Sequence, residues 1–532
     1  MDPDQIRRTL TPWHAALIAV VVLAVVARLL PGERTIDDAF ITFRYARNVL
    51  AGEGFVYNPG ERVQGTTTPL YTLLMAGEKA LLPGAGFPML AIVTNALADA
   101  ASIVVLAWLC KRTLDAPWLG IACGLTWAVS PMSVTFAIGG METSVYVLLL
   151  LLTLACYALG HANWSALFCA LATLTRPDAL LIAVPLFAHM LFVRVFSVLT
   201  RDARRTGDRL LIPWREGAVY FSVLAPWVLF ATLYFGNPLA NSVVAKTAAY
   251  RLDRFSALVR LIQHYATPFF EYEVFTTAWV GVGAVLYLFL SIVGGVAMVR
   301  REGKLLPLAV YPWFYFVAFS ASNPLIFRWY LAPILPVYTL CILYGGLRVG
   351  TDLVTVIRRK WAAAPVAGRA AGLVLVAAAC AMLLNGWTLH PDHGPDRPAP
   401  EMAWFKLEQL YRQATLDLCV NQPVSPETRI AAGDIGVIGF VSGARILDTL
   451  GLVSPESVPY SPLLEEAYVI GYAVSTELIL IERPDYLILL EVYVRNTLLR
   501  SSEFAEQYEL YRHWPTDIYG SDAMMVFRRR AG

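Results

Sequence analysis

Long apolar runs separated by short polar segments fill the first 390 residues of the chain. An α-helix rises about 1.5 Å per residue, so roughly 18 to 20 apolar residues cross the hydrocarbon core of a bilayer. The pattern therefore predicts a polytopic α-helical membrane protein with about eleven transmembrane helices. The predicted spans are residues 13–30, 88–110, 118–137, 144–159, two short spans within 164–193, 217–235, 275–299, 305–319, 329–347 and 365–387.

Basic residues fix the predicted orientation of these spans. Arg7 and Arg8 precede the first span, and further arginines gather at residues 194–215 and around Arg300. Lys and Arg accumulate in cytoplasmic loops, so all of these segments are predicted to lie inside. Eleven spans then place the C-terminal tail outside. The apolar run at residues 70–82 is too short to cross and is typical of an interfacial helix.

The tail differs from the rest of the chain. A linker rich in Pro, His and Asp, residues 391–400, introduces a segment polar enough to fold in water. Short strands are predicted at residues 429–434, 445–450, 486–490 and 524–528, with helical stretches between them. The sequence thus predicts two domains, a membrane domain at residues 1–390 and an extracytoplasmic α/β domain at residues 391–532.

Composition agrees with this fold class and excludes several functions. The chain is 57% hydrophobic and only 15% charged, whereas soluble domains carry about a quarter charged residues. No Gly-rich phosphate loop or nucleotide-binding fingerprint is present, which argues against a soluble nucleotide-sugar donor. The seven histidines are scattered and show no zinc-ligand spacing. No metal, no cofactor and no nucleic acid is therefore expected.

An acid pair, Asp37 and Asp38, directly follows the first span at its outer end. Partial desolvation there raises the pKa of at least one carboxyl, which suits a general base. Capping of the helix predicted at residues 39–51 is an equally good explanation of the pair alone. One Asp suffices for capping, however, and Arg44 and Arg47 follow on roughly the same helical face as Asp37. These two arginines could hold a phosphate.

Six further polar residues are predicted at the same outer face: Glu142, Arg176, Asp178, Lys246, Arg328 and Tyr330. Each has a structural alternative; Glu142 could cap a span and Arg176 could simply pair with Asp178. Ionisable residues at membrane depth are nevertheless costly and are functional candidates. Together they favour a lipid-phosphate substrate, with cations binding the phosphate and a carboxylate deprotonating an attacking hydroxyl.

The first outer loop, DDAFITFRYARN at residues 37–48 followed by NPGERV at 58–63, resembles that of bacterial GT-C glycosyltransferases. These are integral membrane enzymes that use polyprenyl-phosphate sugars. The resemblance continues through shorter motifs and covers most of the chain. The further motifs are residues 140–143, 176–178, 236–242 with 245–247, 328–330, 434–436 and 448–452.

Within that superfamily the chain is most similar to the branch of actinobacterial cell-wall arabinofuranosyltransferases. The resemblance implies an inverting, metal-independent or weakly metal-dependent transfer. It also implies that the base is an Asp of the first outer loop, Asp37 by motif position with Asp38 second. Two positions depart from the family pattern: residues 65–69, GTTTP, and Ala240. These departures affect the prediction of which sugar is transferred more than the prediction of the reaction type.

We therefore expect transfer of one sugar from a polyprenyl phosphate to an acceptor at the outer face of the bacterial plasma membrane. The acceptor could be a cell-wall glycan, a lipid-linked glycan or a protein. In this hypothesis Arg44, Arg47, Lys246 and Arg328 bind the donor phosphate, and Glu142, Arg176, Asp178 and Tyr330 contact substrate. The alternatives are a transporter or flippase of lipid-linked sugars, for which no internal repeat is found, and an acyl or phospho-group transferase.

Overall fold

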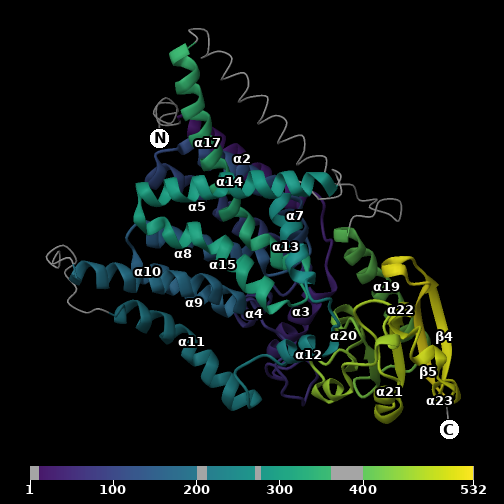
Figure 1. Cartoon of the computed structure of the whole chain (residues 1–532). Helices are drawn as coiled ribbons and strands as arrows, with labels where there is room; N and C mark the ends of the chain where they lie inside the picture. The colour runs from purple at the N-terminus through teal and green to yellow at the C-terminus, as the bar shows by residue number, and fades with distance from the viewer. Residues whose placement is uncertain (1–10, 200–211, 270–276, 361–399, 531–532) are drawn as a thin grey trace.

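The computed structural model describes residues 11–199, 212–269, 277–360 and 400–530. Its first part is a bundle of helices, and its last part is a small sheet domain against one side of that bundle (Figure 1). The helices of the first part are α2 (Pro12–Leu29), α3 (Asp37–Leu50), α4 (Pro69–Leu81), α5 (Phe87–Leu109), α6 (Pro117–Val129), α7 (Pro131–Ile138), α8 (Thr143–Ala158), α9 (Ala162–Thr175), α10 (Leu180–Leu199), α11 (Trp214–Phe235), α12 (Asn241–Ala249), α13 (Ser256–Ala266), α14 (Thr277–Arg301), α15 (Leu306–Ser322), α16 (Arg328–Leu331) and α17 (Leu335–Lys360).

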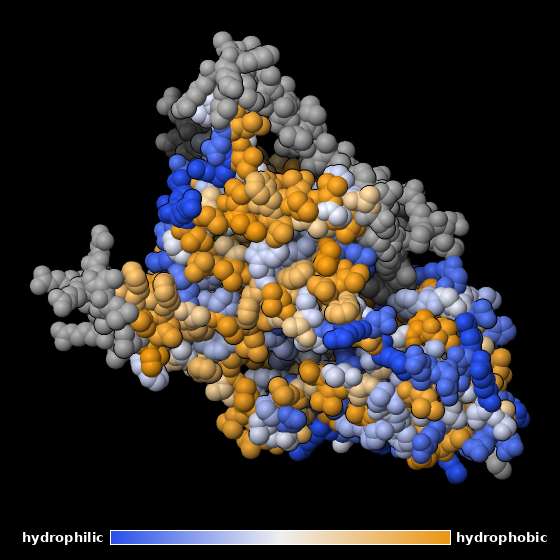
Figure 2. All heavy atoms as spheres, viewed as in Figure 1, coloured by the Kyte–Doolittle hydropathy of each residue, from blue (hydrophilic) through white to orange (hydrophobic). Residues whose placement is uncertain are grey.

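Seven helices of the described part are long and apolar enough to cross a membrane, namely α2, α5, α10, α11, α14, α15 and a helical stretch running from α16 through α17. Apolar residues cover much of the visible face of the bundle, whereas polar residues predominate over the C-terminal part (Figure 2). The helices α8 and α9 are apolar but shorter, at 16 and 14 residues. The first ten predicted spans coincide with helices, and the short apolar run at residues 70–82 is α4. The eleventh predicted span, residues 365–387, lies outside the described residues.

The span predicted at residues 118–137 is not one straight helix. The segment is two helices, α6 and α7, bent by 52° at Ser130. Pro131 has no N–H to donate and its ring clashes with the preceding turn, so the helix breaks there. The guanidinium of Arg28 donates to the carbonyl oxygen of Ala128 at 2.7 Å and to that of Trp127 at 3.3 Å. An arginine of α2 thus satisfies backbone carbonyls next to the break.

Arg28 is itself held by a carboxylate in the middle of the bundle. Its Nε lies 2.7 Å from Oδ2 of Asp99, and neither side chain is exposed. Asp99 also accepts hydrogen bonds from Trp127 Nε1 at 2.9 Å and from Ser144 Oγ at 3.0 Å. Both charges are therefore fully hydrogen-bonded, as a buried ion pair requires. This cluster fixes α2, α5, α6 and α8 relative to one another.

The segment at residues 236–274 between α11 and α14, which lies outside every predicted span, contains two further helices, α12 and α13. The helix α3 begins with two acidic residues, which interact favourably with the positive end of a helix dipole. It ends at Leu50 and is capped by Ala51; Gly52 follows with φ of +81°, a left-handed conformation that glycine adopts without strain. The chain then reverses toward α4.

The C-terminal part is an α/β domain, as predicted. Its elements are α19 (Pro400–Asn421), β1 (Arg429–Ala432), α20 (Gly436–Ser442), β2 (Arg445–Asp448), α21 (Thr476–Glu482), β3 (Tyr486–Leu490), α22 (Glu491–Val494), α23 (Ser502–Gln507), β4 (Tyr508–Pro515) and β5 (Ala523–Arg529). The sheet order is β2-β1-β3-β5-β4. The β1 strand pairs in parallel with β2 and β3, and β5 pairs antiparallel with β3 and β4.

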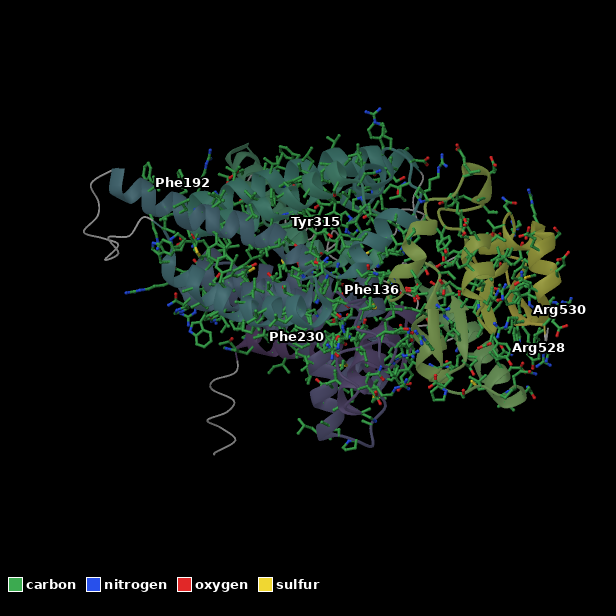
Figure 3. All side chains as sticks on the ribbon, turned by 90° about the horizontal axis from the view of Figure 1, so that it is seen from below. Phe136, Phe192, Phe230, Tyr315, Arg528 and Arg530 are labelled. Atoms are coloured by element: carbon green, nitrogen blue, oxygen red, sulfur yellow. The ribbon has the colours of Figure 1, made fainter. Side chains whose placement is uncertain are left out.

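The four predicted strands are β1, β2, β3 and β5, and only the edge strand β4 was not predicted. The C-terminal domain packs on the membrane helices through α20, which contacts α3. Figure 3 shows this arrangement from below: Phe136 lies near the junction of the two parts, while Phe192 and Arg530 lie at opposite ends of the molecule. The proposed domain boundary between residues 390 and 391 falls outside the described residues and stays a prediction.

Candidate functional site

The helix α3 has two buried faces that meet different parts of the molecule. Residues three, four or seven apart share one face of an α-helix, whereas adjacent residues point about 100° apart. Asp38 and Thr42 lie on one face and line a cavity within the membrane domain. Asp37, Phe40 and Arg44 lie on another, which contacts the C-terminal domain. The sequence-adjacent acids therefore have different environments.

The cavity on the Asp38 side has a volume of about 600 Å³. Six of the ten predicted site residues line it together: Asp38, Glu142, Arg176, Asp178, Lys246 and Tyr330. They come from α3, the starts of α8 and α10, α12 and α16. The remaining four, Asp37, Arg44, Arg47 and Arg328, are not among its lining residues.

Asp38 and Lys246 carry opposite charges and interact electrostatically in this cavity. Burial raises the pKa of the Asp38 carboxyl above its usual value, and the positive charge of Lys246 lowers it in part. The Lys246 ammonium lies 4.9 Å from the centre of the Phe327 ring, a cation–π contact that holds the side chain in place. A half-buried carboxyl with a raised pKa beside a cation is the environment expected of a general base.

A second charged group forms another wall of the cavity. The Arg176 guanidinium lies 3.0 Å from Glu142 and 2.9 Å from Asp178. The same guanidinium lies 4.8 Å from the centre of the Tyr330 ring. Two carboxylates thus compensate one cation, and the group is nearly fully buried. Arg176 is therefore held rigidly, with its charge neutralised by protein acids.

Threonine hydroxyls and the C-terminal domain complete the cavity, and the sequence analysis had not assigned the hydroxyls to the site. Thr66, Thr67 and Thr68 line it beside Thr42, and the Thr66 and Thr68 hydroxyls lie 3.0 Å apart. Leu452 enters from a turn of the C-terminal domain. The three threonines belong to the GTTTP segment, residues 65–69, which the sequence comparison identifies only as a departure from the family pattern. Its repeated hydroxyls are a signal for polyhydroxyl binding that sequence reasoning could have used.

The turn that carries Leu452 is organised by one buried acid. The Asp448 carboxylate accepts backbone N–H bonds from Leu450 at 2.9 Å and from Val453 at 3.0 Å. The Asn241 side chain, at the start of α12, donates to the carbonyl oxygen of Gly451 at 2.6 Å. Since α12 also carries Lys246, this turn supports the part of the cavity wall that holds the cation.

Asp37, predicted first as the base, binds backbone instead. Its carboxylate accepts hydrogen bonds from Gly436 N at 2.7 Å and Val437 N at 2.8 Å, the first residues of α20. A Cβ at Gly436 would lie 1.8 Å from the backbone oxygen of Asp37, so only glycine permits this approach. Burial and the nearby carboxylate of Asp434 raise the pKa of Asp37 well above its usual value. Both carboxylate oxygens of Asp37 are thus engaged in docking α20.

The two arginines predicted to bind phosphate also contact the C-terminal domain. Arg44 is buried; its Nε donates to the carbonyl oxygen of Tyr57 at 2.8 Å, and its Nη2 to that of Ala444 at 2.7 Å. Arg47 donates to the carbonyl oxygen of Phe440 at 2.7 Å and stacks over its ring at 4.6 Å. These contacts place both arginines away from the cavity that contains Asp38 and Lys246.

Arg328 lies in a separate, small cavity of about 40 Å³, which also contains Arg260 and His264. Its sequence neighbours Trp329 and Tyr330 do line the large cavity. The structure therefore brings Lys246 alone, of the four predicted phosphate ligands, into the cavity with Asp38. Among the described residues, no group of three or more His, Cys, Asp and Glu is arranged to hold a metal ion.

Comparisons with known proteins agree with this architecture. Residues 403–527 match the model of a domain of unknown function, DUF8728. A comparison with curated proteins finds no match. The crystal structure of ArnT from Cupriavidus metallidurans bound to undecaprenyl phosphate is similar over 98% of this chain and 98% of that chain, with a TM-score of 0.54 and 15% sequence identity.

The apo crystal structure of the same protein is similar over 96% of this chain and 97% of that chain. The TM-score is 0.51 and the identity is again 15%. Likeness at this identity concerns the fold. The chain is a multi-pass helical membrane protein with an ArnT-like fold and a small C-terminal sheet domain.

Proposed function

We propose that the chain is a GT-C glycosyltransferase that moves one sugar from a polyprenyl phosphate to an acceptor hydroxyl. The observation that carries this proposal is the placement of Asp38 and Lys246 in one cavity of about 600 Å³. The likeness in fold to ArnT, whose structure is described as bound to undecaprenyl phosphate, supports a lipid phosphate as the donor. The resemblance of the first outer loop to GT-C enzymes supports the same reaction.

In this proposal Asp38 is the general base. The acceptor oxygen attacks the anomeric carbon of the donor sugar, its proton passes to the Asp38 carboxylate, and the bond from the anomeric carbon to the phosphate oxygen breaks. A positioned carboxylate contributes about 10²–10⁴-fold to such a step. Direct displacement with one base and no protein nucleophile inverts the anomeric configuration, as in inverting glycosidases.

Lys246 stabilises the charge that accumulates on the leaving lipid phosphate. An ammonium in a partly buried cavity interacts more strongly with a phosphate than it would in water. Arg176 is less suited to this role because Glu142 and Asp178 already compensate its charge. We assign the Glu142–Arg176–Asp178 group and Tyr330 to the sugar, where fixed donors, acceptors and an aromatic ring can orient hydroxyls.

The choice of Asp38 over Asp37 rests on what each carboxylate contacts. A base must reach the reacting hydroxyl within hydrogen-bond distance. Asp38 lines the cavity, whereas both oxygens of Asp37 accept backbone N–H bonds from the C-terminal domain. Asp37 thus fits a positioning role, which reverses the order that the sequence motif implied.

The finer features belong to the proposal as well. We place the cavity and the C-terminal domain at the outer face of the bacterial plasma membrane, because the Arg clusters predict that orientation. The acceptor is a cell-wall glycan, a lipid-linked glycan or a protein, and the motif resemblance favours the arabinofuranosyltransferase branch. Independence of metal ions, with a weak effect of divalent cations at most, remains a prediction.

The decisive experiment incubates the purified chain with a panel of polyprenyl-phosphate sugars and follows release of the free lipid phosphate. We expect release from one donor class, its increase on adding acceptor, and its loss in Asp38→Asn. A transporter would move the lipid-linked sugar between leaflets of a vesicle and leave it chemically intact. Donor that is translocated but never cleaved would therefore replace the transferase proposal. A reporter fused after Arg530 that is active only in the cytoplasm would contradict the orientation.

A further inference from the structure

A second cavity, of about 760 Å³, lies on the opposite side of α3 from Asp38. It is bounded by α3, the end of α4, the start of α5, and the helices α19 and α20 of the C-terminal domain. Phe40 and Arg47, which share the domain-facing side of α3, line it; Asp38 and Thr42 do not. Its volume is in the range of small-molecule binding sites, roughly 300–1,000 Å³.

Aromatic rings form much of this cavity. Phe40, Phe87 and Phe440 pack against one another, with the Phe40 and Phe440 ring centres 5.3 Å apart and those of Phe87 and Phe440 6.0 Å apart. Phe405 of α19 contributes a fourth ring. Aromatic rings offer flat apolar surfaces on which the C–H face of a sugar ring can pack. Phe405 and Phe440 are partly exposed, whereas Phe40 and Phe87 are buried, so two rings can contact a bound sugar chain.

The charged groups of the cavity are largely occupied by the protein. Arg412 is paired with Glu408 at 2.5 Å. The Lys79 ammonium donates to the carbonyl oxygens of Pro83 and Ala85, both at 2.7 Å. These partners weaken the attraction for a highly charged ligand such as a phosphate. Arg47 and the exposed side chain of Gln409 still present donors, which suits a ligand rich in hydroxyls.

We propose that this cavity binds an oligosaccharide, as a site for the extended part of the acceptor glycan. The inference rests on the proposed function and adds a binding site that α3 separates from the reaction cavity. A glycan held there reaches the reaction only by passing around α3. The site therefore contributes to binding long acceptors and does not take part in the chemical step.

The first test is a binding measurement on the full-length chain in detergent against a printed array of bacterial surface oligosaccharides. We expect binding of wild type and Asp38→Asn alike, and at least about fivefold weaker binding of Phe405→Ala and Gln409→Ala. Phe405→Tyr keeps the ring and should retain binding. Lys406→Ala is the matched control on the same helix, since Lys406 bonds Asp517 at 3.1 Å and does not line the cavity.

The second test is turnover with long and single-sugar acceptors. Gln409→Ala should raise KM for the long acceptor about fivefold, with kcat and the KM of the single-sugar acceptor unchanged. A wild-type chain that binds no arrayed oligosaccharide would overturn the site. So would binding to vesicles of anionic lipid that Phe405→Ala and Gln409→Ala weaken equally, because the ligand would then be a lipid headgroup. A third outcome is that Phe405→Ala and Gln409→Ala weaken glycan binding but the wild-type chain cleaves no donor. That outcome would contradict the proposed function and leave the glycan site supported.

Discussion

The two faces of α3 carry similar charged side chains, but one face lines a cavity and the other contacts the C-terminal domain. On one face the Asp38 carboxyl shares a cavity with the Lys246 ammonium. On the other, Asp37 and Arg44 form hydrogen bonds with backbone groups of the C-terminal domain. Acids and arginines are thus equally suited to chemistry and to docking, and what decides between these roles is the partner that the fold supplies.

The comparison predicts its largest effect for Asp38→Asn. The amide keeps the size of the side chain but cannot accept the proton of the attacking hydroxyl. Turnover should fall about 10²–10⁴-fold, with donor binding and the unfolding temperature preserved. Single-turnover cleavage of the lipid donor measures this. Turnover of Asp38→Asn within tenfold of wild type would show that Asp38 is not the general base.

Lys246→Met should have the next largest effect, a fall in turnover of about 10²-fold from loss of charge stabilisation at the leaving phosphate. The pH profile gives a second signature. The base must be ionised, so activity rises as pH increases through the pKa of Asp38. Lys246 lowers that pKa, so its removal should shift the acid limb of the profile to higher pH. An unshifted limb would show that the two groups do not interact.

Asp37→Asn should have a smaller effect on turnover, within about tenfold of wild type, and a measurable effect on stability. The amide nitrogen replaces one acceptor of the α20 backbone N–H groups, at a cost of about 1–3 kcal/mol. Gly436→Ala should act through the same contact, so the double variant should lose less than the sum of the two. Thermal unfolding and turnover are measured together. If Asp37→Asn abolished turnover at unchanged stability, the roles of the two faces would be exchanged.

Arg44→Lys should have the smallest effect on turnover. The lysine keeps the positive charge but not the fork of donors that reaches Tyr57 and Ala444. We expect a loss of about 1–3 kcal/mol in unfolding free energy and an unchanged KM for the lipid donor. A clear rise in the donor KM of Arg44→Lys would instead indicate that Arg44 binds the donor phosphate.

Much of the fold could be predicted because it follows from local patterns. Apolar length predicted the helices that cross the bundle, and short β-rich runs predicted four of the five strands. The break at Ser130 was also visible, as Pro131 within an apolar run, and was overlooked. The edge strand β4 could not be found in this way, because its sequence YELYRHWP is polar and only its pairing with β5 makes it a strand.

The site could be predicted less completely than the fold, because its contacts are between residues far apart in the chain. Helical spacing correctly placed Asp37, Arg44 and Arg47 on one face of α3. It could not predict that this face contacts the C-terminal domain. Their partners lie nearly 400 residues further along the chain, at Gly436 and Phe440. Which of two adjacent acids faces a cavity depends on the rotation of one helix, and long-range packing sets that rotation. The motif therefore located the acid pair without separating its members.

The ion pair between Arg28 and Asp99 has a consequence for how the protein is made. Arg28 belongs to α2, and Asp99 belongs to α5, about 70 residues later in the chain. An arginine within a transmembrane helix costs up to about 2.5–3.5 kcal/mol when it enters the membrane without a partner. Insertion of α2 is therefore expected to remain incomplete or shifted until α5 follows it out of the ribosome. We therefore expect α2 and α5 to enter the bilayer as one cooperative unit, before α3 and its two acids reach their final position.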